Sequence, residues 1–351
     1  MLVFVCASNL TVPKVLSIIA ENPKEDFKVL TPVVQIKKFF DTLFENDKTV
    51  LFDLPEFALS DYCSVPKVIS NYSKLNKSIE RCKKSVLNKV AVRDNFQLYF
   101  ELYYFAEFEL WLVKELSKQS TATFYMKSIN VEPEKLNTFN GTIYRFLNKF
   151  FYSTTVIPII STGSVTGLIS DEYIKEIGAE IITVPLSEKL SELILNRIPE
   201  VKDKKIILLV GGVVKSKLAE EEVYSAIAKE LCSEIERVFD KKNIAVKSHP
   251  VYIEYYATEN NYGKIDPVIP FNVLLNKNIQ LVVGFSSAAL YEASLQKGTT
   301  VISTVELFKG KIREEIYNEN KNYLLRNMSA ANPIHFPKSI EEFSEVIRSA
   351  A

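Results

Sequence analysis

The stretch Lys205-Ile-Ile-Leu-Leu-Val-Gly-Gly212 decides how the second half of the chain folds. A short aliphatic run ends in paired glycines, and a helical pattern from about Leu218 to Phe239 follows it. The apolar run predicts a strand, and the longer periodic stretch predicts a helix that covers it. This strand–glycine–helix order is typical of parallel sheets wrapped by helices, so we expect an α/β protein.

The same alternation of short apolar runs and longer periodic stretches recurs along the whole chain. The remaining strands are expected at Leu2–Cys6, Phe27–Leu30, Val50–Leu54, Thr121–Met126, Thr155–Ile160, Glu180–Val184, Ile244–Lys247, Ile279–Gly284 and Thr299–Ser303. Helices are expected from Asn9 or Thr11 to Ala20 and at Lys67–Leu87, Phe96–Leu116, Tyr144–Phe151, Glu188–Ile198, Ala288–Leu295 and Ile340–Ala350. The aromatic residues of Phe96–Leu116 fit a helix that faces the core better than an acceptor-binding surface.

Two domains are the natural expectation for 351 residues, at roughly 100–200 residues each. The charged stretch Val201–Lys205 follows Pro199 and resembles a linker. We therefore expect domains at 1–200 and 201–351 that face each other across a cleft. In open parallel sheets, ligands bind beyond the carboxyl ends of the strands.

The composition excludes several classes of protein. Lys plus Arg and Asp plus Glu both number 43, and a nucleic-acid-binding protein would usually carry a basic excess. The four cysteines, Cys6, Cys63, Cys82 and Cys232, have neither disulfide nor zinc spacing, so we expect buried thiols in a reducing compartment. The apolar start at Met1 is too short for a signal peptide, and no run is long enough to span a bilayer.

These features predict a cytoplasmic protein. The cationic run Lys74, Lys77, Arg81, Lys83, Lys84 and Lys89 leaves open a peripheral contact with the inner membrane face. A solvated helix face is the commoner explanation of such a run.

Three loops at predicted strand ends carry groups suited to a phosphate. They are Gly211-Gly212, Lys247-Ser248-His249-Pro250 and Gly284-Phe285-Ser286-Ser287. Glycines let the backbone approach a ligand closely, a histidine can donate a proton, and hydroxyls before a helix can hold an anion. Each loop also has a purely structural explanation: a turn, a histidine bonded to the backbone, or a helix cap.

No carboxylate cluster flanks the three loops, so we expect a site without a metal ion. A cofactor is not expected either. The loops should meet around the phosphate of one nucleotide, with His249 and the two serine hydroxyls closest to it.

These residues resemble the signature of bacterial sialyltransferases, including capsular polysialyltransferases and lipooligosaccharide sialyltransferases. The family pairs His-Pro with Ser-Ser, which here are His249-Pro250 and Ser286-Ser287. Between them, Asp266-Pro-Val-Ile-Pro-Phe-Asn-Val-Leu-Leu275 is similar to the family's Pro-Phe-Glu-Val-Leu segment. The resemblance covers about residues 205–305 and is faint elsewhere, apart from Ala7–Lys14, where such enzymes start their first helix.

The resemblance implies a GT-B fold of two Rossmann-like domains, with a C-terminal helix that packs back. It implies an acceptor-binding N-terminal domain and a C-terminal domain for a CMP-linked nonulosonic acid, with inverting transfer to an oligosaccharide, glycolipid or polysaccharide. His249 would stabilise or protonate the departing phosphate. The other donor-binding residues would be Gly211, Gly212, Lys247, Pro250, Pro270, Phe271, Asn272, Ser286 and Ser287.

The chain departs from the family in two places. The family's acidic Asp/Glu-Asp/Glu-Gly motif, which supplies the catalytic base, is not found. The nearest substitutes are Glu132 and Glu134, or Phe139-Asn140-Gly141 as a degenerate version, although an asparagine cannot accept a proton as a base. Asn272 stands where the family has a glutamate.

These departures keep other functions open. One is a catalytically quiet relative that binds a nucleotide or glycan during capsule assembly. Another is a transferase that uses CMP-Kdo, CMP-pseudaminic acid or CDP-glycerol. The last is an α/β protein in which the three loops are structural.

Overall fold

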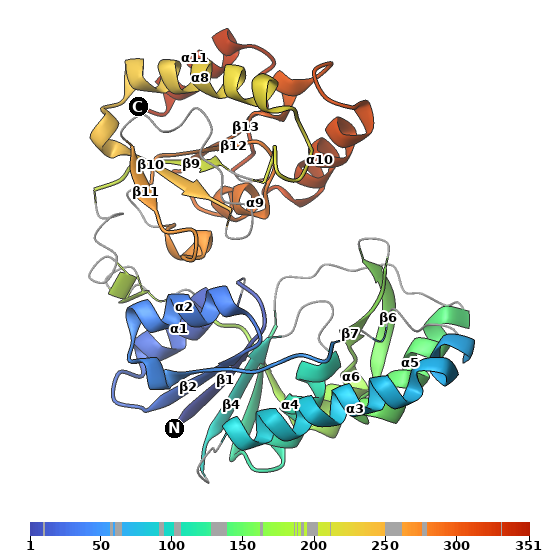
Figure 1. The fold of residues 1–351 in the computed structure, drawn as a ribbon. Coiled ribbons are helices and arrows are strands. Elements are labelled where there is room, and N and C mark those ends of the chain that lie inside the picture. Colours follow the sequence, from blue (N-terminus) through green and yellow to red (C-terminus); the bar gives the residue numbers. More distant parts are fainter. Residues whose placement is uncertain are drawn as a thin grey trace. The chain divides into compact units, whose positions relative to one another are not determined.

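The computed structural model describes residues 1–9, 11–56, 59, 65–90, 95–101, 107–127, 139–161, 164–185, 187, 189–190, 193–194, 203–210, 212–249, 262–275, 279–330 and 332–351. The chain divides into two compact units, Met1–Leu190 and Ser191–Ala351. Each unit is built around one parallel sheet (Figure 1). This confirms the predicted α/β class.

The N-terminal unit holds a parallel sheet in the order β3-β2-β1-β4-β5-β8. Its strands are β1 (Leu2–Cys6), β2 (Phe27–Thr31), β3 (Thr49–Leu51), β4 (Gln97–Glu101), β5 (Ala122–Met126) and β8 (Glu180–Ile182). An antiparallel pair, β6 (Val156–Ser161) and β7 (Ser164–Ile169), stands beside it. The helices are α1 (Val12–Glu21), α2 (Val34–Leu43), α3 (Val65–Lys89), α4 (Glu107–Ser117), α5 (Phe139–Tyr152) and α6 (Asp171–Glu176), with a 3-10 turn η1 (Asn46–Lys48).

The C-terminal unit holds a parallel sheet in the order β11-β10-β9-β12-β13. Its strands are β9 (Ile206–Val210), β10 (Ile244–Ser248), β11 (Gly263–Ile265), β12 (Leu281–Gly284) and β13 (Thr300–Ser303). Its helices are α8 (Glu221–Val238), α9 (Ala288–Ser294), α10 (Glu314–Asn327) and α11 (Ile340–Ser349), with 3-10 turns η4 (Lys241–Asn243), η5 (Phe271–Val273) and η6 (Val305–Phe308). Figure 1 shows α8 and α11 together on one side of the sheet and α9 on the other.

Burial explains why the central strands are apolar runs. Every residue of β1, β10 and β12 is buried, as expected for parallel strands with helices on both faces. The C-terminal helix α11 packs back against α8, and the Ser344 hydroxyl donates a 2.7 Å hydrogen bond to Glu234.

One predicted element is wrong. The stretch Phe96–Leu116, expected as a single helix, contains the strand β4 and then the helix α4. Strand β4 is central, between β1 and β5, so apolar side chains are favoured on both of its faces. A run of that kind has no period that separates strand from helix. The helices α2, α6 and α10 and the strands β7 and β11 were not predicted.

Three cysteines, Cys6, Cys82 and Cys232, are free and buried, as expected. Cys63 and most of the expected helix Glu188–Ile198 lie outside the described residues. None of the helices in the described ranges is long and apolar enough to cross a membrane.

Candidate functional site

The strand order of the C-terminal unit locates its candidate site. The chain enters at β9, adds β10 and β11 on one side, and then adds β12 and β13 on the other. The order therefore reverses between β9 and β12, and ligands of open α/β sheets bind in the crevice at that point, beyond the carboxyl ends of the strands. The three predicted loops leave β9, β10 and β12 at this edge.

The strand ends are level with one another. Ser248 of β10 pairs with Val210 of β9, and Gly284 of β12 pairs with Leu209 of β9. Neighbouring strands lie about 4.8 Å apart, so the starts of the β10 and β12 loops flank β9 at a spacing of about 10 Å. A phosphate group placed above β9 is within reach of side chains from both loops.

Gly212 and His249 lie against each other. Gly212 has a φ of +79°, in the left-handed region that favours glycine. A Cβ atom on Gly212 would lie 3.9 Å from the Cβ, Cγ and Cδ2 atoms of His249. The structure thus brings the β9 loop and the histidine together, and the exposed His249 lies at the carboxyl edge of the sheet. Gly211 and Pro250 lie outside the described residues.

Hydrogen bonds from the end of β13 hold the start of the serine loop in place. The Ser303 hydroxyl donates a 2.7 Å hydrogen bond to the Phe285 carbonyl, and the Thr304 amide donates one of 2.8 Å to the Gly284 carbonyl. Packing favours glycine at position 284, because a Cβ atom there would lie 3.0 Å from the Cβ atom of Leu209, closer than most such contacts. The loop is therefore anchored before Ser286 and Ser287 begin.

The two serines differ in what they do. Ser287 is the N-cap of α9, and its hydroxyl oxygen accepts a hydrogen bond of 3.2 Å from the Ala289 amide. Capping explains Ser287 but leaves its O–H group able to donate to a ligand. Ser286 is half-buried, and its hydroxyl has no hydrogen-bond partner among the described residues. Ser286 is therefore the hydroxyl more available to an anion.

Lys247 is a buried residue that binds two backbone carbonyl groups next to the candidate site. Its buried ammonium group donates hydrogen bonds to the Ser248 carbonyl at 3.0 Å and the Pro267 carbonyl at 2.9 Å. Burial lowers the pKa of Lys247 to about 8, and the nearby charge of Asp266 opposes that decrease. Lys247 thus ties the end of β10 to the turn after β11. Its predicted contact with a donor remains a prediction.

The segment resembling Pro-Phe-Glu-Val-Leu forms η5, which lies against α9. Pro270 precedes the turn, Phe271 is buried, and Asn272 is half-buried. This turn therefore neighbours the helix that follows the serine loop.

The other histidine lies elsewhere. The backbone of His335 pairs with Ile302 of β13, and its amide donates a 2.8 Å hydrogen bond to the Val301 carbonyl. It therefore belongs to the outer edge of the sheet, and only His249 stands at the switch point.

The N-terminal unit has a switch point of its own, between β1 and β4. Cys6 of β1 pairs there with Glu101, the last residue of β4. The Glu101 carboxylate is only 2% exposed and accepts a 2.7 Å hydrogen bond from the Lys14 ammonium group. Burial raises the pKa of Glu101, and the neighbouring Lys14 charge opposes the increase. An acidic residue thus occupies the carboxyl edge of this sheet.

Glu101 is not among the predicted site residues, because the sequence predicts a helix where the structure has the strand β4. The predicted bases Glu132 and Glu134 lie outside the described residues. Asn140, from the degenerate motif, lies in the first turn of α5. A signal was present, since a carboxylate inside an aromatic run is costly to bury without a partner.

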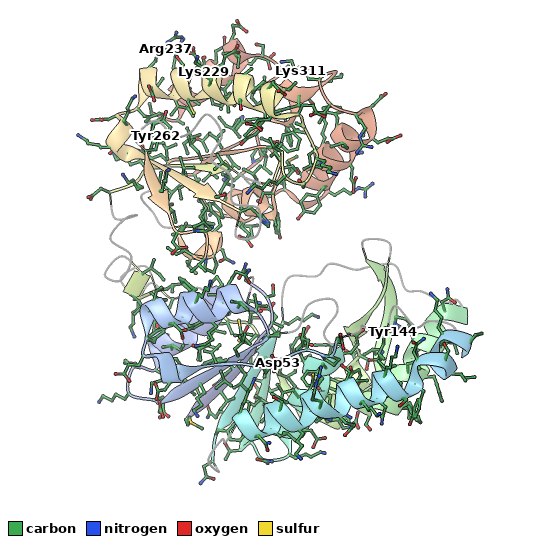
Figure 2. The ribbon with its side chains drawn as sticks, viewed as in Figure 1. Asp53, Tyr144, Lys229, Arg237, Tyr262 and Lys311 are labelled. Atoms are coloured by element: carbon green, nitrogen blue, oxygen red, sulfur yellow. The ribbon has the colours of Figure 1, made fainter. Side chains whose placement is uncertain are left out.

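Two further carboxyl groups are buried in the first turn of α4. Glu107 accepts a hydrogen bond from the hydroxyl of Tyr144, a fully buried residue of α5 that is labelled in Figure 2. Burial raises the pKa of Glu109 to about 8, and its Oε2 atom has no hydrogen-bond partner among the residues that the structure describes.

Metal ligation finds no support within the described ranges, where no three His, Cys, Asp or Glu side chains lie close enough to hold an ion. The metal-independent reaction remains a prediction.

No protein-family model and no curated protein matches the chain. Among solved structures, it is similar to CalG4, the calicheamicin glycosyltransferase, with 13% identity, a TM-score of 0.40 and coverage of 99% of this chain and 88% of that chain. A putative UDP-N-acetylglucosamine 2-epimerase from Listeria monocytogenes has 12% identity and a TM-score of 0.40 over 99% and 87% of the two chains. WaaG, a glycosyltransferase involved in lipopolysaccharide biosynthesis, has 10% identity and a TM-score of 0.32 over 100% and 90%. Values this low do not transfer an activity.

Proposed function

We propose that this protein is a glycosyltransferase that moves sialic acid or a related nonulosonic acid from a CMP-sugar to an acceptor glycan. The observation that carries the proposal is that His249 lies against Gly212 at the carboxyl edge of one parallel sheet, and that the Ser286–Ser287 loop begins at the same edge, on the other side of β9. We further propose that transfer inverts the anomeric carbon and needs no metal ion.

The proposed donor site answers the main electrostatic need of the reaction. As the bond between the anomeric carbon and the phosphate oxygen breaks, negative charge grows on the CMP phosphate. Donors aimed at that charge stabilise the transition state more than the ground state. Hydroxyls of Ser286 and Ser287 on one side and the imidazole of His249 on the other supply such donors. Gly212 leaves room for the phosphate because it has no side chain.

The nucleoside would lie toward η5. That turn neighbours the serine loop through α9, so a nucleotide whose phosphate meets Ser286 can extend over Asn272. An amide side chain both donates and accepts hydrogen bonds, which suits ribose hydroxyls. Lys247 would position this turn through its bond to the Pro267 carbonyl.

The acceptor step needs a base, and we propose Glu101 for it. The acceptor hydroxyl oxygen forms the new bond to the anomeric carbon, its proton passes to the Glu101 carboxylate, and CMP departs with the bonding electrons. A carboxylate with a raised pKa accepts a proton more readily, and burial gives Glu101 that property. Glu132 and Glu134 stay as the alternative bases that the sequence suggested.

The test compares three variants on the whole protein with a CMP-nonulosonic acid donor. His249→Ala should lower CMP release, both to water and to acceptor, by about 100-fold, the usual effect of losing a charge-stabilising or acid group. His335→Ala is the matched control and should change neither rate. Glu101→Gln should abolish transfer to the acceptor while CMP binding by calorimetry stays within about twofold.

The outcomes separate the components of the proposal. Full activity in His249→Ala would refute the donor site, and full transfer in Glu101→Gln would refute the base alone. Ligand protection against thermal unfolding decides the nucleotide: stronger protection by UDP or CDP than by CMP would refute the CMP donor and would favour another activated sugar or CDP-glycerol.

A second function has one observation in its favour. Glu101 is already paired with Lys14 and almost completely buried, which suits a structural ion pair as well as a base. A catalytically quiet protein that binds a nucleotide during capsule assembly would bind CMP but release none from any donor, with or without acceptor. CMP binding that weakens in His249→Ala, in a protein with no turnover, would establish that alternative.

A further inference from the structure

A seam of exposed apolar side chains runs between α3 and α5. Ile69 is 73% exposed, Phe146 65%, Phe150 55% and Tyr72 43%. The ring of Phe150 lies 6.2 Å from that of Tyr72 and 6.0 Å from that of Phe146. Ile69 precedes Tyr72 by one helical turn, so the four side chains form one continuous seam.

Packing of the core does not account for the seam. Both helices already bury the neighbouring face, α3 through residues such as Leu75 and Ile79 and α5 through Leu147 and Phe151. The Lys83 ammonium group also joins the helices by donating to the Phe151 carbonyl at 2.7 Å. Because these contacts hold the helices in place, the exposed rings are not needed for packing within the unit. They are available to contact a partner outside it. Contiguous exposed apolar side chains mark interaction surfaces.

Positive charge is concentrated around the seam. The segments of α3 and α5 carry nine Lys and Arg side chains and one carboxylate, Glu80, in a chain whose net charge is zero. Lys83 and Lys89 are engaged by Glu80 and Asp53. The other cations form no ion pair with any residue that the structure describes; they are Lys67, Lys74, Lys77, Arg81, Lys84, Arg145 and Lys149.

The cations lie on both sides of the seam. With about 100° per residue along a helix, Lys77 and Lys84 lie some 60–80° around α3 from Ile69, on the side away from the buried face. On α5, Arg145 and Lys149 lie about 60–100° from Phe146, in the direction opposite to Phe150. Since Phe150 faces Tyr72, the basic side chains flank the apolar seam rather than interrupt it.

We propose that this surface docks the protein onto a membrane that contains anionic lipid. The seam would enter the boundary between headgroups and acyl chains, and the flanking cations would lie among the headgroups. Basic residues beside an apolar stripe are the pattern of helices that lie in the interface plane. A second copy of this chain is disfavoured, because a twofold contact would place two strongly positive surfaces together. The aliphatic Ile69 and the phenyl rings suit acyl chains, whereas a nucleic acid needs no aliphatic contact.

The test uses the full-length protein with vesicles of phosphatidylcholine alone or mixed with phosphatidylglycerol. Sedimentation should show binding to the mixed vesicles only, and the binding should weaken as salt rises. Phe146→Ser combined with Phe150→Ser should lower the vesicle affinity at least about tenfold, since two partly buried phenyl groups are lost. Lys77→Glu combined with Lys84→Glu should lower it by a similar factor and flatten the salt dependence.

Matched changes in the C-terminal unit serve as controls. Leu325→Ser removes an apolar side chain that is 40% exposed on α10, and Lys229→Glu reverses an exposed charge on α8 (Figure 2). Neither should change the vesicle affinity. Fluorescence of Trp111, whose ring centre lies 5.3 Å from the Lys83 ammonium group, shows that the N-terminal unit of the α3 and α5 variants still folds, and far-ultraviolet circular dichroism checks the two control variants.

Several results would overturn the proposal. Absence of binding to the mixed vesicles would do so, as would equal binding by the double phenylalanine variant. A dimer that dissociates in the double phenylalanine variant would make a second copy the occupant. Tighter binding to single-stranded RNA than to vesicles would assign the surface to nucleic acid. None of these results bears on donor or acceptor chemistry, so the proposed transfer reaction stands or falls separately.

Discussion

Replacing Lys247 by methionine tests how the donor side of the C-terminal unit is built. The ammonium group is buried and holds two backbone carbonyls, those of Ser248 and Pro267. Methionine keeps the length and apolar volume of the side chain but removes the charge and both hydrogen bonds. The lost hydrogen bonds cost the same at every pH, so the pH dependence isolates the charge.

The magnitude follows from the pKa. Burial lowers the pKa of Lys247 from 10.5 to about 8, an interval worth about 3 kcal/mol of differential stability. Below pH 8, the side chain is protonated in both the folded and the unfolded chain. Between pH 8 and 10.5 the unfolded chain still holds a proton that the folded protein has released, so the stability of the wild type rises with pH. The methionine variant lacks this rise.

The assay is urea unfolding at pH 7.5 and pH 10.5, followed by far-ultraviolet circular dichroism. The single tryptophan, Trp111, lies in the N-terminal unit and so reports that unit by its fluorescence. We expect the free energy of unfolding of the wild type, relative to Lys247→Met, to increase by about 3 kcal/mol over this range. Lys229→Met, at an exposed position on α8, should show no such increase. Parallel pH profiles for the wild type and Lys247→Met would refute the reasoning.

Two other substitutions test packing and buried charge. Gly284→Ala should destabilise the C-terminal unit by about 1–3 kcal/mol in urea unfolding and weaken CMP protection, because its Cβ atom would meet Leu209 at 3.0 Å; unchanged values would show that the strands adjust freely. For Glu109, burial raises the pKa from 4.5 to about 8, so the N-terminal unit loses stability as pH rises through this interval. Glu109→Gln should therefore gain at least about 2 kcal/mol on the wild type between pH 5 and pH 9 by Trp111 fluorescence, and a constant difference would contradict the shift.

The sequence predicts the strand ends of the C-terminal unit better than the end of β4 in the N-terminal unit, for a physical reason. In the C-terminal unit, glycine, histidine and serine interrupt apolar runs where the strands end. These residues therefore indicate both the end of each strand and the position of the candidate site. Gly212, His249 and Ser286 were found in this way. Around Glu101, aromatic residues continue on both sides of the acid without glycine or proline. No residue there signals the end of β4, so the Glu101 carboxylate falls inside the predicted helix Phe96–Leu116.

The two switch points share one topology and differ in chemistry. In both sheets the first strand along the chain is central, and the order in which strands are added reverses beside it. The reversal places one crevice at β1 and β4 and another at β9 and β12. The C-terminal crevice presents hydroxyls, an imidazole and glycine, which can donate hydrogen bonds to a phosphate. The N-terminal crevice presents a buried carboxylate held by a lysine, which would repel a phosphate but can accept a proton from a hydroxyl. Under the proposed function, the first set of groups suits the phosphate of the donor and the second suits the hydroxyl of the acceptor.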